Sequence, residues 1–125
     1  MIGNLIQVAL GGALGASLRY LSNVASMRLF GPSFPWATVF VNVLGSFLMG
    51  VLAVTLAHKG GTRFAPFLMT GILGGFTTFS AFSLDTLTLW ERGQVVPAAL
   101  YVAASVALSL AAIVAGLAAA RWAIS

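Results

Sequence analysis

A run of glycines and hydroxyl residues interrupts an apolar stretch in the middle of the chain. It reads Gly71-Ile72-Leu73-Gly74-Gly75-Phe76-Thr77-Thr78-Phe79-Ser80-Ala81-Phe82. In lipid, every backbone N–H and C=O group needs a partner within the protein, so irregular backbone persists only where it lines a protected cavity or binds something. Carbonyl groups freed by a break at these residues would suit a hard cation, as in transporters whose unwound helices bind sodium. The alternative is that Gly71 and Gly74 only allow close helix packing.

Polar side chains recur at every fourth position of two other apolar stretches. The two series are Thr38, Asn42, Ser46 and Tyr101, Ser105, Ser109. Residues four apart share one face of a helix, so each series would line a single face. The Asn42 amide either joins helices through hydrogen bonds or donates to an anion. A single hydroxyl can bond its own i−4 carbonyl, but three in line opposite an aliphatic face favour a wet groove.

An arginine and two phenylalanines complete the candidate residues. Arg19 lies inside the first apolar stretch, where a charge is costly and usually faces a cavity or a partner. It either attracts anions at the mouth of a pathway or reaches the headgroups by snorkelling. Phe79 and Phe82 lie three residues apart and would project to one side of a helix that begins after the break. Their positive ring edges could contact an anion without strong binding, although packing or a lipid-facing position is the commoner role.

The composition requires a membrane environment. Of the 125 residues, 60% are hydrophobic and 6% are charged, whereas roughly a quarter of a soluble domain is charged. A chain of this length could not bury so much apolar surface in water. The six basic residues are scattered and form no stripe suited to nucleic acid. Cysteine is absent, which excludes disulfides and thiolate chemistry.

Four apolar stretches are long enough to cross the hydrocarbon core, which takes about 20 residues. We place the spans near residues 4–25, 36–57, 65–90 and 97–120 of a single transmembrane domain, residues 1–125. The predicted fold is an all-α membrane protein with four transmembrane helices, the third broken within the membrane. No cleaved signal peptide is expected, because no basic region precedes the first apolar run, which contains Arg19.

The basic residues are nearly balanced between the two sides of the membrane. Lys59, Arg63 and Arg121 fall on the N-terminal side, and Arg28 and Arg92 fall on the opposite side. This balance predicts insertion in both orientations and pairing with an inverted copy, unless it is only a weak signal on a small protein. Four helices are too few to enclose a pathway, so we expect an oligomer. Close helix packing is expected at small residues four apart: Gly11/Gly15, Ser46/Gly50, Gly71/Gly75 and Ala112/Gly116.

These motifs resemble the small fluoride channels of the Fluc/CrcB family. The resemblance covers the whole chain and is carried by residues 11–20, 42–47 and 74–82. It implies an antiparallel, dual-topology homodimer with two pores, which passively conducts fluoride out of the cytoplasm. It also implies a multi-pass protein of the bacterial cytoplasmic (inner) membrane, with a structural sodium ion at the dimer centre.

The resemblance also implies roles for individual residues. The pore residues are Asn42, Phe79, Phe82, Tyr101, Ser105 and Ser109, with Thr38 and Ser80. Arg19 would lie near the vestibule, and the backbone carbonyls of Gly74 and Thr77 would bind sodium. Glu91 lies close to the expected place of a vestibule acid. Because fluoride is tightly hydrated, a pore needs many weak donors, and lysine, a strong point charge, is absent from the spans.

The main alternative is a small multidrug-resistance exporter, which is also a four-span, dual-topology design. Proton-coupled export of cations needs a membrane-buried carboxylate, and the only acids are Asp85 and Glu91, within or at the end of the third span. A structural or accessory membrane subunit would give no reason for the broken helix. We expect no enzyme, since there is no carboxylate pair and the lone His58 has no metal-binding partner.

Overall fold

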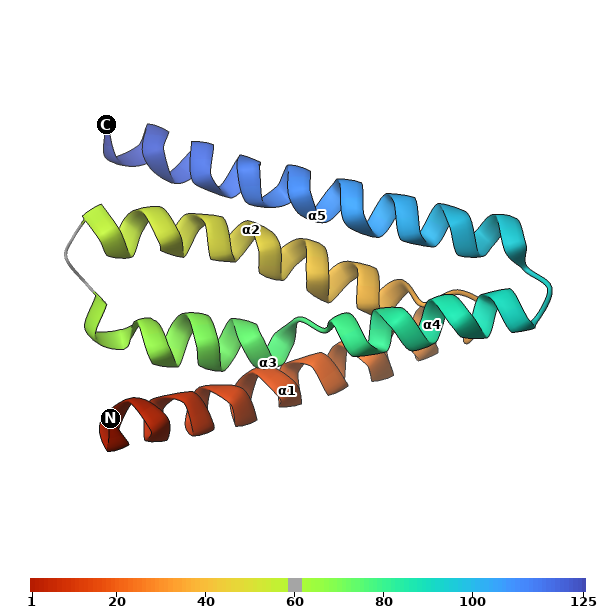
Figure 1. Cartoon of the computed structure of the whole chain (residues 1–125), viewed down its shortest axis with the longest axis horizontal. Coiled ribbons are helices and arrows are strands. Elements are labelled where there is room, and N and C mark those ends of the chain that lie inside the picture. Colours follow the sequence, from red (N-terminus) through yellow and green to blue (C-terminus); the bar gives the residue numbers. More distant parts are fainter. Residues whose placement is uncertain (59–61) are drawn as a thin grey trace.

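Helices account for all the regular structure in the described part of the chain, residues 1–58 and 62–125 of a computed structural model. In chain order they are α1 (Ile2–Phe30), α2 (Trp36–His58), the 3₁₀ turn η1 (Thr62–Phe64), the π-helical segment η2 (Pro66–Leu73), α3 (Gly74–Phe76), α4 (Phe79–Glu91) and α5 (Val95–Ile124) (Figure 1). Helices cover each of the four stretches predicted as spans, and each helix or helical run extends beyond at least one predicted end. Helices have no need to stop where the hydrocarbon stops, which explains the longer ends. Lys59 lies outside the described residues.

Three of these spans are long and apolar enough to cross a membrane. They are Trp36–His58, Thr62–Glu91 and Val95–Ile124, with mean hydropathies of 2.2, 1.4 and 2.3 in their most apolar parts. The first helix, α1, has 29 residues but falls outside this group. Asn4, Gln7 and Arg19 lower its hydropathy, so the first span is less apolar than the other three. Its polar side chains therefore need partners inside the protein.

Glycine and proline end the helices at the predicted loops. Gly31 follows α1 with φ 76° and donates its N–H to the Met27 carbonyl at 3.0 Å. Gly93 follows α4 with φ 79°. Such positive φ values favour glycine, which has no Cβ to clash with the backbone. Pro32 and Pro35 then keep the α1–α2 connection out of a helix.

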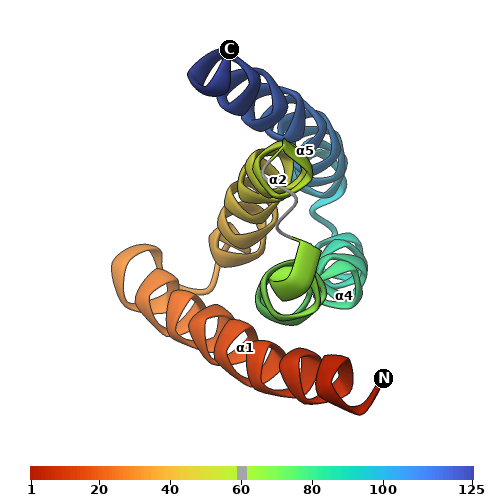
Figure 2. The same cartoon turned by 90° about the vertical axis from the view of Figure 1, so that its left-hand side faces the viewer.

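The helices pack as two pairs. α2 lies along α5, while α1 lies along η2 and α3, so the third span sits between α1 and the α2–α5 pair (Figures 1 and 2). Glycines let the backbones touch, since a Cβ on Gly15 would meet the Ile72 carbonyl and one on Gly116 would meet the Phe47 carbonyl. The expected small-residue contacts are therefore confirmed at these two seams.

Both termini lie at the same end of the molecule (Figure 1). The end of α2 and the start of η1 lie there too, whereas the α1–α2 and α4–α5 connections lie at the opposite end. Arg63 belongs to η1 and Arg121 to the last turn of α5, whereas Arg28 lies in the last turn of α1 and Arg92 caps α4. The two pairs of basic residues therefore belong to opposite ends of the molecule, as the sequence predicts.

The α1–η2 seam gives a direct test with a matched control. Gly15→Ala should lower the melting temperature, because the added methyl group meets the Ile72 backbone and overpacking costs about 1–3 kcal/mol. Gly12→Ala is the same change on the same helix, but its Cβ would meet nothing within 4 Å. Thermal unfolding of both variants in detergent checks this. Equal melting temperatures would contradict the close packing of α1 against η2 at Gly15.

Candidate functional site: a polar groove at the broken helix

The third span is broken at Thr77 and Thr78 rather than at the glycines. Gly74 and Gly75 are helical, α3 ends at Phe76, and α4 restarts at Phe79. The two threonines between them are extended, with φ/ψ of −86°/159° and −155°/121°. The Ala81 amide donates to Thr78 Oγ1 at 3.1 Å, so Thr78 caps the new helix.

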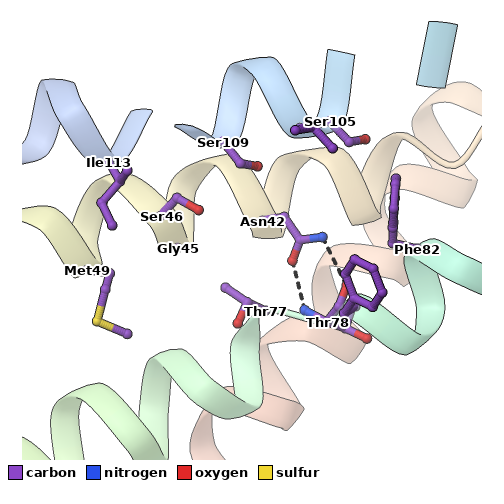
Figure 3. A pocket seen from close by; sticks show the side chains of 12 residues that line it. Asn42, Gly45, Ser46, Met49, Thr77, Thr78, Phe82, Ser105, Ser109 and Ile113 are labelled. Carbon is purple, nitrogen blue, oxygen red and sulfur yellow. Dashed lines mark hydrogen bonds between the residues drawn. The ribbon is translucent and has the colours of Figure 1, made fainter. Parts of the chain in front are cut away.

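Asn42 on α2 holds the break through both backbone groups of Thr78. Its Nδ2 donates to the Thr78 carbonyl at 3.0 Å, and its Oδ1 accepts from the Thr78 amide at 2.8 Å (Figure 3). This pair of bonds satisfies two polar groups that an extended residue in lipid would otherwise leave open. Asn42 therefore joins helices, and one of its two Nδ2 hydrogens remains for another acceptor.

The same bonds remove the helical donors of two carbonyl groups. In a continuous helix the Thr78 amide would donate to the Gly74 carbonyl, and the Ala81 amide would donate to the Thr77 carbonyl. The first amide binds Asn42 Oδ1 instead, and the second binds Thr78 Oγ1. Gly74 and Thr77 are the two residues whose carbonyls the resemblance assigns to sodium.

A groove of about 320 Å³ opens beside the break. Residues from α2, the break, α4 and α5 line it: Asn42, Gly45, Ser46, Met49, Thr77, Thr78, Phe79, Phe82, Ser105, Val106, Ser109 and Ile113 (Figure 3). Five of the expected pore residues thus lie around one space: Asn42, Phe79, Phe82, Ser105 and Ser109. Among the residues that the structure describes, none with a basic side chain lines it.

Ser105 contributes to this groove a buried hydroxyl without a hydrogen-bond partner among the described residues. Its side chain is only 5% exposed, and Oγ has no hydrogen-bond partner among the described residues. Other helical hydroxyls bond their own i−4 carbonyls, as Thr55 and Thr86 do at 2.9 and 2.8 Å. A buried hydroxyl without a partner is unfavourable. The Ser105 hydroxyl is therefore available to something that enters the groove.

The two phenylalanines lie together but in different surroundings. Their ring centroids are 5.4 Å apart with planes tilted by 48°. Phe82 is 8% exposed and packs against Tyr101, whereas Phe79 is 77% exposed on the single chain. An exposed ring and an exposed Gly74 next to a helix break make this surface one that another molecule could cover.

Three expected pore residues lie outside the groove. The Thr38 hydroxyl and the fully buried Tyr101 hydroxyl both donate to Asp85 Oδ2, at 2.7 and 2.9 Å. Ser80 is exposed, and its Oγ lies 3.3 Å from Thr78 Oγ1. The role of Asp85 was open from the sequence. The spacing along the two spans could have indicated this contact. Thr38 precedes Asn42 by one helical turn, and Asp85 follows Thr78, the partner of Asn42, by about two turns on the facing span.

Arg19 binds a backbone carbonyl close to the break. Its Nε donates to the Gly75 carbonyl at 3.0 Å across the α1–α3 contact. It also lines a separate cavity of about 210 Å³ with Thr38 and Asp85. The described residues contain no cluster of three His, Cys, Asp or Glu side chains, so the candidate ligands for a cation near the break are backbone, hydroxyl or amide oxygens.

Comparison with known proteins gives one family. The family model described as CrcB-like protein, Camphor Resistance (CrcB) matches residues 6–117. A protein of Cereibacter sphaeroides named "Fluoride-specific ion channel FluC" is 73% identical over 121 residues, which cover 97% of each chain. Proteins with the same name from Paracoccus denitrificans and a Ruegeria species are 61% and 56% identical, over 90% and 97% of each chain.

The hydrogen bonds of Asn42 give a stability prediction. Asn42→Ala should lower the melting temperature strongly, because the Thr78 amide and carbonyl lose their partners at about 1–3 kcal/mol each. Ser46→Ala, one turn along the same helix and on the same groove, should have little effect. Thermal unfolding of the two variants in detergent decides, and an Asn42→Ala protein as stable as Ser46→Ala would contradict the role of Asn42 at the break.

Proposed function

The chain belongs to the CrcB-like protein family, and from this membership we propose that it is a fluoride-selective channel. It would carry fluoride passively out of the cytoplasm, as a multi-pass protein of the bacterial inner membrane. Relatives that match almost the full length carry the name "Fluoride-specific ion channel FluC". A channel breaks no bonds, so we propose no enzymatic activity.

The observation in the structure that supports this proposal is the donor set of the groove. Fluoride gives up its hydration water only if several other donors replace it, and it leaves again only if none of them binds it too strongly. The free Ser105 hydroxyl, the second Nδ2 hydrogen of Asn42 and the Ser109 hydroxyl are such donors. The ring edges of Phe79 and Phe82 add weak positive contacts.

We further propose that two copies pair in opposite orientations, giving two pores. Gly74, Phe79 and Ser80 are exposed on the single chain next to a break in its third span. Polar backbone in the hydrocarbon region needs cover from protein, and a second copy would supply it. The near balance of basic residues between the two ends supports both orientations.

A structural sodium ion at the centre of this dimer is the cofactor we propose. Hard cations bind oxygen ligands, and the Gly74 and Thr77 carbonyls have lost their helical donors. Uncharged carbonyls suit a monovalent ion, because they would leave most of the charge of a divalent ion uncompensated at bilayer depth. The same two carbonyls of a second copy would double the ligand set. Bound there, the cation would partly offset the cost of an anion in the nearby groove.

The multidrug-exporter alternative is not favoured. It needs a carboxylate that exchanges protons for substrate, and Asp85 already accepts hydrogen bonds from Thr38 and Tyr101 outside the groove. Glu91 is exposed at the end of α4. The named relatives are fluoride channels, and none of these observations supports proton-coupled cation export.

Fluoride efflux from liposomes tests the proposed function. The purified protein should release fluoride, while chloride efflux stays at the level of empty liposomes. Ser105→Ala should slow fluoride efflux about tenfold, which corresponds to one lost hydrogen bond to an ion. Ser83→Ala is the control, since Ser83 is exposed and bonds its own i−4 carbonyl. Absence of fluoride efflux would overturn the channel, and equal rates for the two variants would overturn the role of Ser105.

A further inference from the structure

Arg19 binds the backbone of the third span close to the break. Its Nε donates at 3.0 Å to a backbone carbonyl, that of Gly75, which lies 56 positions away in the sequence. The bond is partly buried, and the accepting residue, Gly75, is the last but one residue of α3. A charge at this depth usually faces a cavity or a partner, and here the partner is the helix next to the break.

Close packing of α1 and α3 brings Arg19 to this carbonyl. A Cβ on Gly75 would lie 2.7 Å from the Gly12 carbonyl and 3.1 Å from the Ala16 amide, so only glycine lets the two backbones touch. Arg19 follows Ala16 by about one turn on the same helix. The side chain therefore reaches along the seam to the last turn before the extended threonines.

The break leaves three neighbouring carbonyls in need of partners. Those of Gly74 and Thr77 have lost their helical donors to Asn42 and Thr78. In a continuous helix the Gly75 carbonyl would accept from the Phe79 amide, but Phe79 begins the next helix after an extended segment. Arg19 Nε serves the Gly75 carbonyl instead.

We propose that Arg19 is a positioning residue, which decides which carbonyls at the break face the central cation. By holding the Gly75 carbonyl, it fixes the last peptide groups of α3 and leaves the Gly74 and Thr77 carbonyls as the ligands. This inference rests on the central sodium ion of the proposed function. It assigns the effect to the Nε donor, because the guanidinium charge by itself repels a nearby cation.

Three substitutions of Arg19 distinguish the effect of its hydrogen-bond donor from the effect of its charge. Glutamine carries Nε2 on Cδ, the position of Nε in arginine, so Arg19→Gln keeps a donor in place and loses the charge. Arg19→Met has a similar length and loses both. Arg19→Lys keeps the charge but moves the donor one bond further along the side chain. Arg28→Met is the matched control, since Arg28 is exposed on the same helix.

The readout is the sodium concentration that half-maximally raises the melting temperature of the purified protein. The titration is done in detergent, with N-methylglucamine keeping the ionic strength constant. Wild type, Arg28→Met and Arg19→Gln should have midpoints within about threefold. Arg19→Met and Arg19→Lys should need about tenfold more sodium or show no stabilisation, as expected when one hydrogen bond from a charged group is lost.

Several results would overturn the proposal. One is an Arg19→Met midpoint equal to that of wild type. Another is an Arg19→Gln midpoint like that of Arg19→Met while Arg19→Lys resembles wild type, which would assign the effect to the charge. If Arg19→Met does not fold, the comparison of Arg19→Gln with Arg19→Lys decides.

Two measurements on the wild-type protein, fluoride efflux and stabilisation by sodium, distinguish a failure of this inference from a failure of the proposed function. Fluoride efflux without any stabilisation by sodium would overturn the role of Arg19 and leave the channel standing. Stabilisation by sodium without fluoride efflux would overturn the channel proposal instead.

Discussion

A backbone amide or carbonyl without a partner is costly in lipid, and the rest of this structure depends on how the chain meets that constraint at Thr77 and Thr78. Two extended residues interrupt the third span. Asn42 binds both backbone groups of Thr78, and the Thr78 hydroxyl caps the helix that follows. These contacts come from α2 and from the break itself, so the break is built into the packing of the bundle.

The two sides of the break differ in their chemistry. On one side lies the groove, where weak donors from α2 and α5 face two phenylalanines and where the described lining residues include no basic one. On the other side α1 touches α3 through glycines, and Arg19 binds the Gly75 carbonyl. The Arg19 guanidinium thus stays outside the groove proposed for the anion. This separation fits the proposed channel, which must release fluoride as readily as it admits it.

The sequence allowed the class of fold and the existence of the break to be predicted, but not the place of the break. Apolar length defines membrane helices, and glycines with paired threonines signal an interruption. Gly74 and Gly75 remain helical because their lack of side chains serves packing, with Gly75 against α1. The groove members Asn42, Ser105 and Ser109 followed from helical spacing. Hydrogen-bond partners on different helices could not be predicted in this way. Asn42 binds Thr78 and Thr38 binds Asp85, 36 and 47 residues away, and these contacts depend on which helices pack together, which the spacing within one helix does not reveal.

The central claim of the proposed function is that the break meets its counterpart across the axis of the proposed dimer. The chain has no cysteine, so a single Gly74→Cys substitution would place one thiol at the exposed face of α3. Its Cβ would approach only the Met69 carbonyl, at 3.6 Å, so the site accepts the side chain. Oxidative crosslinking in native membranes should give a covalent dimer for Gly74→Cys and none for Val114→Cys, which is exposed on α5. A Gly74→Cys protein that stays monomeric, or one that crosslinks no better than Val114→Cys, would contradict the account.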